Sequence, residues 1–197
     1  KTNTKVTHFL FNNLTYGKTR VRHKIKNIHN LQKKYNFELI ETWSNLHHFY
    51  PPKQQIGFEQ THTLRNAAIP HFLGIGTNFL YSSTFSDNHI ILQESSDISI
   101  VDTILLPLLS SKKVSCQSVG NEYSRVEKTL KVAEMPDAYH HLDTCIGKQS
   151  IDCLNCGKCR KCTRALLTFE LIDCLHLFKN VFNLKTWRKG RKDYISN

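Results

Sequence analysis

Five of the seven cysteines fall within eighteen residues near the end of the sequence, and cysteine thiolates are ligands for zinc and for iron. Cys153, Cys156, Cys159 and Cys162 recur at intervals of three residues, and Cys145 precedes them by eight. A CxxC spacing lets two sulfurs reach one ion, and a structural zinc site takes four such ligands in a tetrahedron. The stretch therefore predicts a metal site with a structural role.

Five cysteines compete for four zinc positions, so one of them is surplus. We expect Cys156, Cys159 and Cys162 to bind the ion, with a helix that begins near Cys162 and presents its positive end to the last thiolate. The fourth ligand is either Cys145 or Cys153. We favour Cys145, because a distant ligand joins two segments, whereas ligands at strict three-residue intervals leave little chain to surround an ion.

Other uses of these cysteines are weaker alternatives. Disulfides are disfavoured because Cys116 and Cys174 are scattered and no secretory signal precedes them. An iron-sulfur cluster remains open, since thiolate spacing alone does not choose the metal. Catalytic zinc is disfavoured because four thiolates leave no open coordination position, and His140-His141 is discounted as a ligand beside five thiolates.

The composition fits a globular protein in a reducing, cytoplasmic setting. The chain has 197 residues, 40% of them hydrophobic, which is enough for one domain with a small appendage. No apolar run approaches the roughly 20 residues that a membrane span requires. The longest candidate, Ile98 to Leu109, is interrupted by Asp102 and Pro107.

The net charge of +11 raises the question of a nucleic-acid partner. The charge concentrates in Lys18 to Lys34 and in Lys179 to Lys192. Solvated helix faces are the interpretation that we favour, and a basic zinc-ribbon module that binds nucleic acid is the alternative function.

Hydrophobic periodicity predicts strands that alternate with helices. The expected strands are 6–11, 37–43, 78–81 and 114–119, and the expected helices are 21–35, 58–72, 124–135 and one that follows Cys162. In the second helix Leu64, Ala67, Ala68 and Phe72 form the expected apolar face. Pro70 is expected to kink its last turn, and Gly74 and Gly76 to end it. This order is typical of an α/β fold with a parallel, Rossmann-like sheet and crossover helices, whose ligand sites lie at the carboxyl ends of the strands.

Three further segments could contact a ligand. Ser124 and Glu127 form a capping box at a helix start where Arg125 and Lys128 add positive charge, which suits a phosphate or an ordinary capped helix equally. The hydroxyl-rich loop of residues 81–87 suits a ligand contact or a plain turn. His62 is a ligand contact or, more commonly, a half-buried histidine with satisfied hydrogen bonds.

With these residues in view, the chain resembles the PP-loop ATP pyrophosphatase superfamily, and within it the 7-cyano-7-deazaguanine synthase family of the queuosine pathway. The segment from Phe11 to Arg20 matches a turn that follows a strand in that family, and Arg125-Val126-Glu127 matches a K-x-E pattern at the start of a late helix. The family also ends with an isolated cysteine, then CxxCxxC, then a helix with an early arginine, here Arg164.

The resemblance implies an adenine nucleotide alpha hydrolase type of fold with structural zinc at Cys145, Cys156, Cys159 and Cys162. In the family, ATP with magnesium adenylates a carboxylate or a similar oxygen of a small molecule, pyrophosphate leaves, and a nitrogen nucleophile attacks. The positions that the resemblance places at the nucleotide are Asn12, Tyr16, Ser82, Ser83, Arg125 and Lys128.

The sequence also departs from the family, because it contains no SGGxDS phosphate loop. We therefore expect the chain to be the C-terminal portion of an ATP-dependent C–N ligase, inactive by itself. Residues 1–138 would form a partial nucleotide-binding domain without its first strand and PP-loop, and residues 139–197 the zinc knuckle and a helical segment. A membrane partner is not expected, and a homodimer is left open.

Overall fold

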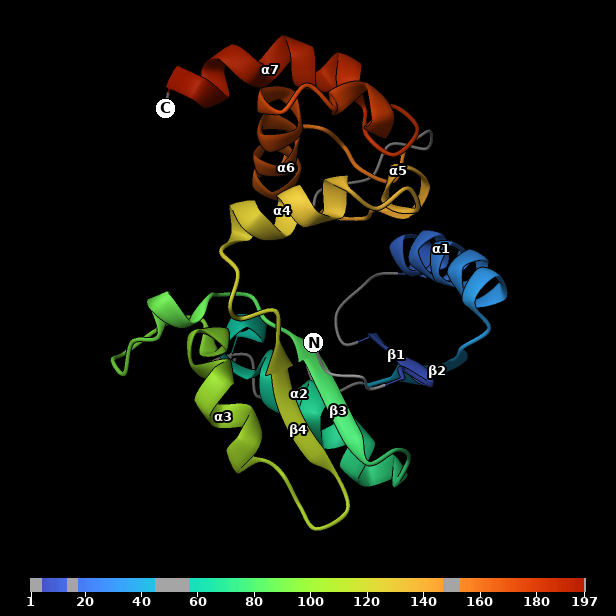
Figure 1. Cartoon of the computed structure of the whole chain (residues 1–197), viewed down its shortest axis with the longest axis vertical. Helices are drawn as coiled ribbons and strands as arrows, with labels where there is room; N and C mark the ends of the chain where they lie inside the picture. Colours follow the sequence, from blue (N-terminus) through green and yellow to red (C-terminus); the bar gives the residue numbers. More distant parts are fainter. Residues whose placement is uncertain (1–4, 14–17, 45–56, 147–152, 197) are drawn as a thin grey trace. The chain divides into compact units, whose positions relative to one another are not determined.

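The computed structural model describes residues 5–13, 18–44, 57–146 and 153–196, and Figure 1 shows the arrangement of their helices and strands. The chain is mixed α/β, with short parallel strand pairs in its first part and helices in its last part. In chain order the elements are β1 (His8–Asn13), α1 (Lys18–Tyr35), β2 (Glu38–Trp43), α2 (Phe58–Leu73), β3 (Asn78–Ser82), η3 (Asp87–His89), η4 (Ile98–Val101), α3 (Asp102–Leu108), β4 (Ser115–Val119), α4 (Arg125–Ala133), α5 (Ala138–His141), α6 (Arg160–Leu171), η5 (Leu175–Phe178) and α7 (Leu184–Ser196).

The chain divides into two compact units. Unit 1 comprises Lys1–Gly17 and Gln32–Arg125, and unit 2 comprises Lys18–Leu31 and Val126–Asn197. The sequence-based division at residue 138 stays a prediction.

Unit 1 contains the four strands, and each pairs in parallel with one partner. β1 pairs with β2, so that Asn12 lies opposite Thr42 near the carboxyl ends of both strands. β3 pairs with β4, and Tyr81 lies opposite Ser118. These strands agree with the expected ones to within two residues. Among the described residues, however, they form two separate two-stranded sheets and not a single Rossmann-like sheet.

The helix α2 forms as expected but buries a different face. Figure 1 shows α2 behind the β3–β4 pair. Of the four residues expected to face the core, only Ala67 is buried, and Phe72 is 89% exposed. The buried residues of the helix are mostly polar: Thr61, His62, Thr63, Arg65, Ala67 and Pro70. The expected face was wrong because these polar groups find hydrogen-bond partners inside unit 1, which offsets the loss of contact with water.

The end of α2 follows the sequence signals. The helix continues past Pro70 to Leu73, and Gly74 ends it with a left-handed φ of 63°. A glycine suits this position because its lack of a Cβ removes the steric cost of a positive φ.

Unit 2 has an aromatic core. The rings of Phe169 in α6 and Phe178 in η5 stack with their centroids 3.8 Å apart, and Phe182 and Tyr139 contact Phe178 edge-on. Trp187 of α7 is 1% exposed. The hydrophobic periodicity predicted no further helix after the one that follows Cys162, whereas the structure shows the helix α7 near the end of the chain.

The described helices include none with the combination of length and apolar character that a membrane span needs.

Candidate metal centre

The first turn of α6 presents two of the cysteines. Cys159 is the residue before the helix and has an extended backbone, with φ −78° and ψ 156°. Its carbonyl oxygen accepts a hydrogen bond from the Thr163 backbone N–H at 2.9 Å, which begins the helix. Cys162 follows within the first turn and is fully buried. The CxxC spacing therefore works as expected, with one sulfur just before the helix and one inside it.

Four sulfur atoms converge at this helix start. The Sγ atoms of Cys145, Cys156, Cys159 and Cys162 all lie within 4.8 Å of one another. The Cys159 and Cys162 sulfurs are 3.4 Å apart, and those of Cys156 and Cys162 are 4.0 Å apart. Four thiolates about 2.3 Å from a central ion would be about 3.8 Å from each other in a tetrahedron. The observed separations therefore match what a single tetrahedral ion needs.

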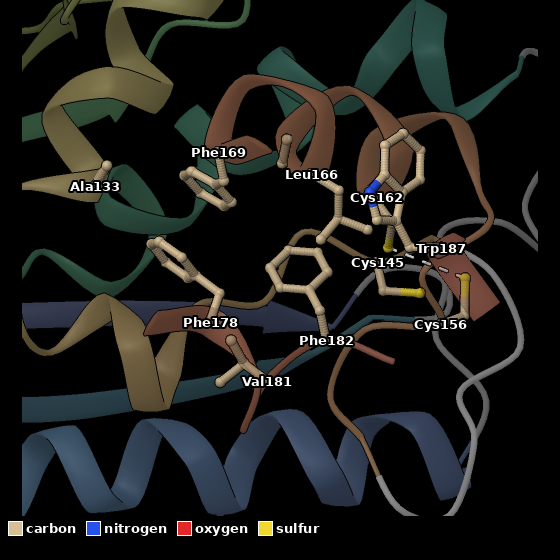
Figure 2. Close-up of a cluster of buried hydrophobic side chains, with 11 residues drawn as sticks. Ala133, Cys145, Cys156, Cys162, Leu166, Phe169, Phe178, Val181, Phe182 and Trp187 are labelled. Atoms are coloured by element: carbon tan, nitrogen blue, oxygen red, sulfur yellow. Dashed lines mark hydrogen bonds between the residues drawn. The ribbon is translucent and has the colours of Figure 1, made fainter. Parts of the chain in front are cut away.

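Three of the four cysteines are buried from solvent. Cys145, Cys156 and Cys162 have exposures of 2%, 5% and 0%, and Cys159 is half-buried. Figure 2 shows the first three at one end of the aromatic core, with Trp187 beside Cys162. Such a site has no open coordination position for a substrate.

Gly157 allows the chain to turn between Cys156 and Cys159. Its φ is +74°, and a Cβ at this position would lie 2.4 Å from the Asn183 carbonyl oxygen. A side chain is excluded by both the backbone conformation and this close contact. The turn thereby packs directly against the start of α7.

Asn155 holds the segment of Cys145 next to the other cysteines. Its side chain is 0% exposed. The Oδ1 atom accepts a 2.8 Å hydrogen bond from the Thr144 backbone N–H, and Nδ2 donates to the carbonyl oxygens of Leu142 and Val181 at 2.7 and 2.9 Å. One asparagine therefore joins three segments around the cluster. The sequence analysis missed this residue, and its place inside the cysteine run was the available signal.

An ion pair supports the same segment. Lys24 of α1 donates to Asp143 Oδ2 at 2.5 Å, and Asp143 Oδ1 accepts from the Cys145 backbone N–H at 3.2 Å. Both charged side chains are nearly buried, with exposures of 13% and 11%. The pair fixes the backbone immediately before the Cys145 sulfur.

Burial, together with the neighbouring cysteines, raises the pKa of the Cys162 thiol. Ionised sulfurs this close repel one another, and burial removes the water that would solvate them. Without a cation, Cys162 therefore favours the thiol over the thiolate. A divalent ion would reverse this preference and displace the protons.

The surplus cysteines lie elsewhere. Cys153 is half-buried and does not belong to the group of four close sulfurs, and Cys116 lies in unit 1 on β4. The His141 Nδ1 atom lies 2.8 Å from the Asn27 side chain and not at the cluster. The structure thus groups the same four cysteines that the sequence analysis selected.

The residues expected at a nucleotide are spread over both units. Asn12 is in β1, Ser82 ends β3, and the Ser83 N–H donates to the Val119 carbonyl oxygen. Arg125 donates to the Thr84 carbonyl oxygen at 2.7 Å, so the arginine is held at the loop after β3. Lys128 belongs to unit 2. Tyr16 lies outside the described residues.

A network of polar side chains connects the carboxyl ends of β1, β2 and β3. Asn12 accepts from the Thr42 hydroxyl and donates to Asn66 Oδ1, both at 3.0 Å. Asn66 Nδ2 lies 3.3 Å from the Tyr81 hydroxyl, which in turn lies 3.1 Å from His62 Nδ1. This edge of parallel strands is where α/β proteins bind ligands.

His62 also faces a carboxylate. Its Nε2 atom lies 3.2 Å from Asp97 Oδ1, and the ring stacks on Phe58 with centroids 5.2 Å apart. Asp97 accepts hydrogen bonds from the Ser99 backbone and hydroxyl as well. These bonds outweigh the effect of burial and lower the pKa of Asp97. The ring is therefore held on both sides, which agrees with a buried histidine whose hydrogen bonds are satisfied.

Comparisons of this chain with protein-family models, with curated proteins and with solved structures find no match. The conclusions on function therefore depend on the cysteine cluster, on the polar network and on the charge of the two units.

Proposed function

We propose that Cys145, Cys156, Cys159 and Cys162 hold one structural zinc ion that stabilises unit 2. The observation that carries this proposal is the convergence of four sulfurs within 4.8 Å at the edge of a buried core. Zinc prefers four thiolates in a tetrahedron and has no redox chemistry, which suits a closed site. Its role here is to join the segment before Cys145 to the first turn of α6.

The sulfur separations favour a single ion over an iron-sulfur cluster. A cluster with two or more irons distributes its four cysteines over different iron atoms, which places some of the sulfurs farther apart than the 4.8 Å within which all four lie here. A single iron ion would have the same geometry as zinc. The metal content of the purified protein distinguishes the two.

The test measures metal by mass spectrometry in the wild type and in two matched variants. We expect one zinc per chain in the wild type. Cys145→Ser should lose the zinc, whereas Cys153→Ser should retain it, because only Cys145 belongs to the group of close sulfurs. Iron in place of zinc, or loss of metal in Cys153→Ser alone, would contradict the assignment.

Unit 1 suggests a second function, a role in an ATP-dependent ligase of the PP-loop type. The supporting observation is the polar network at the carboxyl ends of β1, β2 and β3, which includes Asn12, one of the positions that the sequence resemblance implies. In such a ligase ATP activates a carboxylate-like oxygen with release of pyrophosphate. The phosphate loop of that family is absent from the sequence, so this chain would contribute contacts to the nucleotide or substrate only.

Binding, and not turnover, is therefore the appropriate assay for this second function. Isothermal titration with ATP and magnesium should give a measurable Kd, and Asn12→Leu should weaken binding about tenfold, because removing one hydrogen bond to a ligand costs about 1.4 kcal/mol. Asn88→Leu, on the exposed helix η3, is the control and should bind as the wild type does. Absence of ATP binding by the wild type, or equal effects of the two substitutions, would contradict a nucleotide-binding role for unit 1.

A further inference from the structure

The positive charge of the chain belongs almost entirely to unit 2. Unit 2 has 18 lysines and arginines against 8 aspartates and glutamates, whereas unit 1 has 9 against 8. The sequence alone did not show this separation, because unit 2 combines residues 18–31 with the last part of the chain. Positive charge that is concentrated in one folded unit is typical of a surface that binds an anionic partner.

Within unit 2, one side of α7 packs against α6. The Trp187 indole N–H donates to Glu170 Oε2 at 3.0 Å, and Arg191 pairs with the other oxygen of the same carboxylate. Tyr194 contacts the Trp187 ring edge-on. These three α7 residues are spaced by four and three positions, so they share one face of the helix.

A second face of α7 is wholly basic. Lys185, Arg188, Lys189 and Lys192 follow the spacing i, i+3, i+4 and i+7, which puts them on one stripe about 100° wide. All four are exposed. In the part of the chain that the structure describes, none of these four side chains has a hydrogen bond or an ion pair, so the cations are available to a partner.

We propose that this basic stripe of α7 (Lys185, Arg188, Lys189 and Lys192) binds the phosphate backbone of a nucleic acid. Lys185 and Lys192 are seven positions apart, so the stripe extends about 10 Å along the helix axis. A nucleic-acid strand carries one charge per roughly 3.4 Å of duplex axis, so the stripe can face about three successive phosphates. Contacts of this kind would carry no sequence preference.

The structure disfavours an anionic membrane as the partner. A basic helix that lies on a membrane inserts an apolar face between the lipids. In α7, Trp187 is 1% exposed and bonded to Glu170 of α6, and the exposed large apolar residues are Tyr194 and Ile195 near the end of the helix, at 36% and 62%. Two such residues in the last turn do not form an apolar face along the helix, so the basic stripe suits a phosphate backbone better than a lipid surface.

The test is fluorescence anisotropy of the full chain with a labelled 20-base-pair DNA duplex and a 20-nucleotide RNA, over a range of salt. The stripe variant changes Lys185, Arg188, Lys189 and Lys192 to Gln. The control variant changes Lys33, Lys112, Lys113 and Lys179 to Gln, which removes the same charge from four other exposed positions. Zinc content and melting temperature of both variants report on the fold.

We expect the wild type to bind at 50 mM salt and the stripe variant to bind at least tenfold more weakly. Plots of log K against log salt should become shallower by about 3 for the stripe variant, because each lost phosphate contact removes close to one unit of slope. The control variant should lose less than threefold in affinity.

Three outcomes would overturn the proposal. The first is that the wild type does not bind nucleic acid at 50 mM salt, and the second is that the stripe and control variants lose equal affinity. The third is that the stripe is needed for binding to vesicles with 30% phosphatidylserine but not for binding to nucleic acid. A stripe variant that has lost its zinc or melts early is replaced by the two pairwise variants, Lys185→Gln with Lys189→Gln and Arg188→Gln with Lys192→Gln. Wild-type affinity in both of these would likewise overturn it.

Discussion

Thr63 donates a 2.7 Å hydrogen bond to Asp102 inside unit 1, and both residues are buried, with exposures of 0% and 2%. The bond engages only Oδ1 of the carboxyl group, and Oδ2 has no hydrogen-bond partner among the described residues. Burial outweighs this bond and raises the pKa of Asp102 from 3.8 to about 6. Below about pH 6 the folded state therefore holds Asp102 as the protonated, neutral acid.

The first prediction concerns pH. Because the pKa is raised on folding, the contribution of Asp102 to stability is fully present below about pH 4 and is lost as the pH rises through about 6. Asp102→Asn cannot ionise, so its melting temperature relative to the wild type should be higher at pH 7.5 than at pH 5. Thermal denaturation at both values measures this. An equal pH-dependent change in the exposed Asp173→Asn variant would show that burial is not the cause.

The second prediction compares two glycines of unit 2. Gly157→Ala should destabilise the protein by about 2 kcal/mol or more, because alanine is disfavoured at positive φ and its Cβ would approach the Asn183 carbonyl oxygen. Gly190→Ala, in α7 with open space around it, should instead stabilise by about 0.5 to 1 kcal/mol through helix propensity. Urea denaturation of both variants checks the two signs, and equal effects would contradict the predicted turn.

The third prediction concerns Asn155. Replacing it with Ala should cost about 2 to 4 kcal/mol, since the Thr144 N–H and the Leu142 carbonyl oxygen would each lose their partner. Asn155→Asp should be at least as harmful, because it sets a carboxylate against the carbonyl oxygens of Leu142 and Val181. Asn180→Ala, at an exposed position, is the control and should stay within about 0.5 kcal/mol of the wild type. Chemical denaturation measures all three.

The fourth prediction uses Trp187 as a reporter of the metal. Its ring is 1% exposed and lies beside Cys162, whereas Trp43 in β2 is 61% exposed. In a Trp43→Phe background, removal of zinc with a chelator should shift the emission to longer wavelength, because metal loss loosens the packing around Trp187. Added zinc should restore the spectrum. An emission maximum that does not move on complete removal of the metal would mean that the ion does not support this core.

The strands and helices were largely predictable because their signals are local. The apolar runs at β1 to β4, the cysteine spacing before α6 and the glycine after α2 each depend on a few neighbouring residues. The choice of Cys145 over Cys153 depended instead on the argument that a distant ligand joins two segments, and the group of four close sulfurs contains Cys145 and not Cys153.

The failures involve partners that are distant in sequence. The face of α2 could not be assigned, because the hydrogen-bond partners of His62 and Thr63 are distant in sequence. These partners are Tyr81, Asp97 and Asp102, which lie 19 or more residues away. The helix α7 was missed because most of its residues are basic and it has no clear apolar periodicity. Its buried face depends on Glu170 of α6, which contacts Trp187 and Arg191. Hydrophobic periodicity predicts that a segment is a strand but does not predict which strand pairs with it. The sequence therefore could not distinguish two separate strand pairs from a single sheet.

The bonds of Asn155 also bear on synthesis. The Asn155 backbone N–H donates to Val181, and the Asn183 N–H donates back to Asn155, while Gly157 packs against Asn183. A nascent chain with all four cysteines translated still lacks these contacts until some twenty more residues have left the ribosome. If the four cysteines hold an ion, its firm retention would therefore require a chain that has been made at least through Asn183.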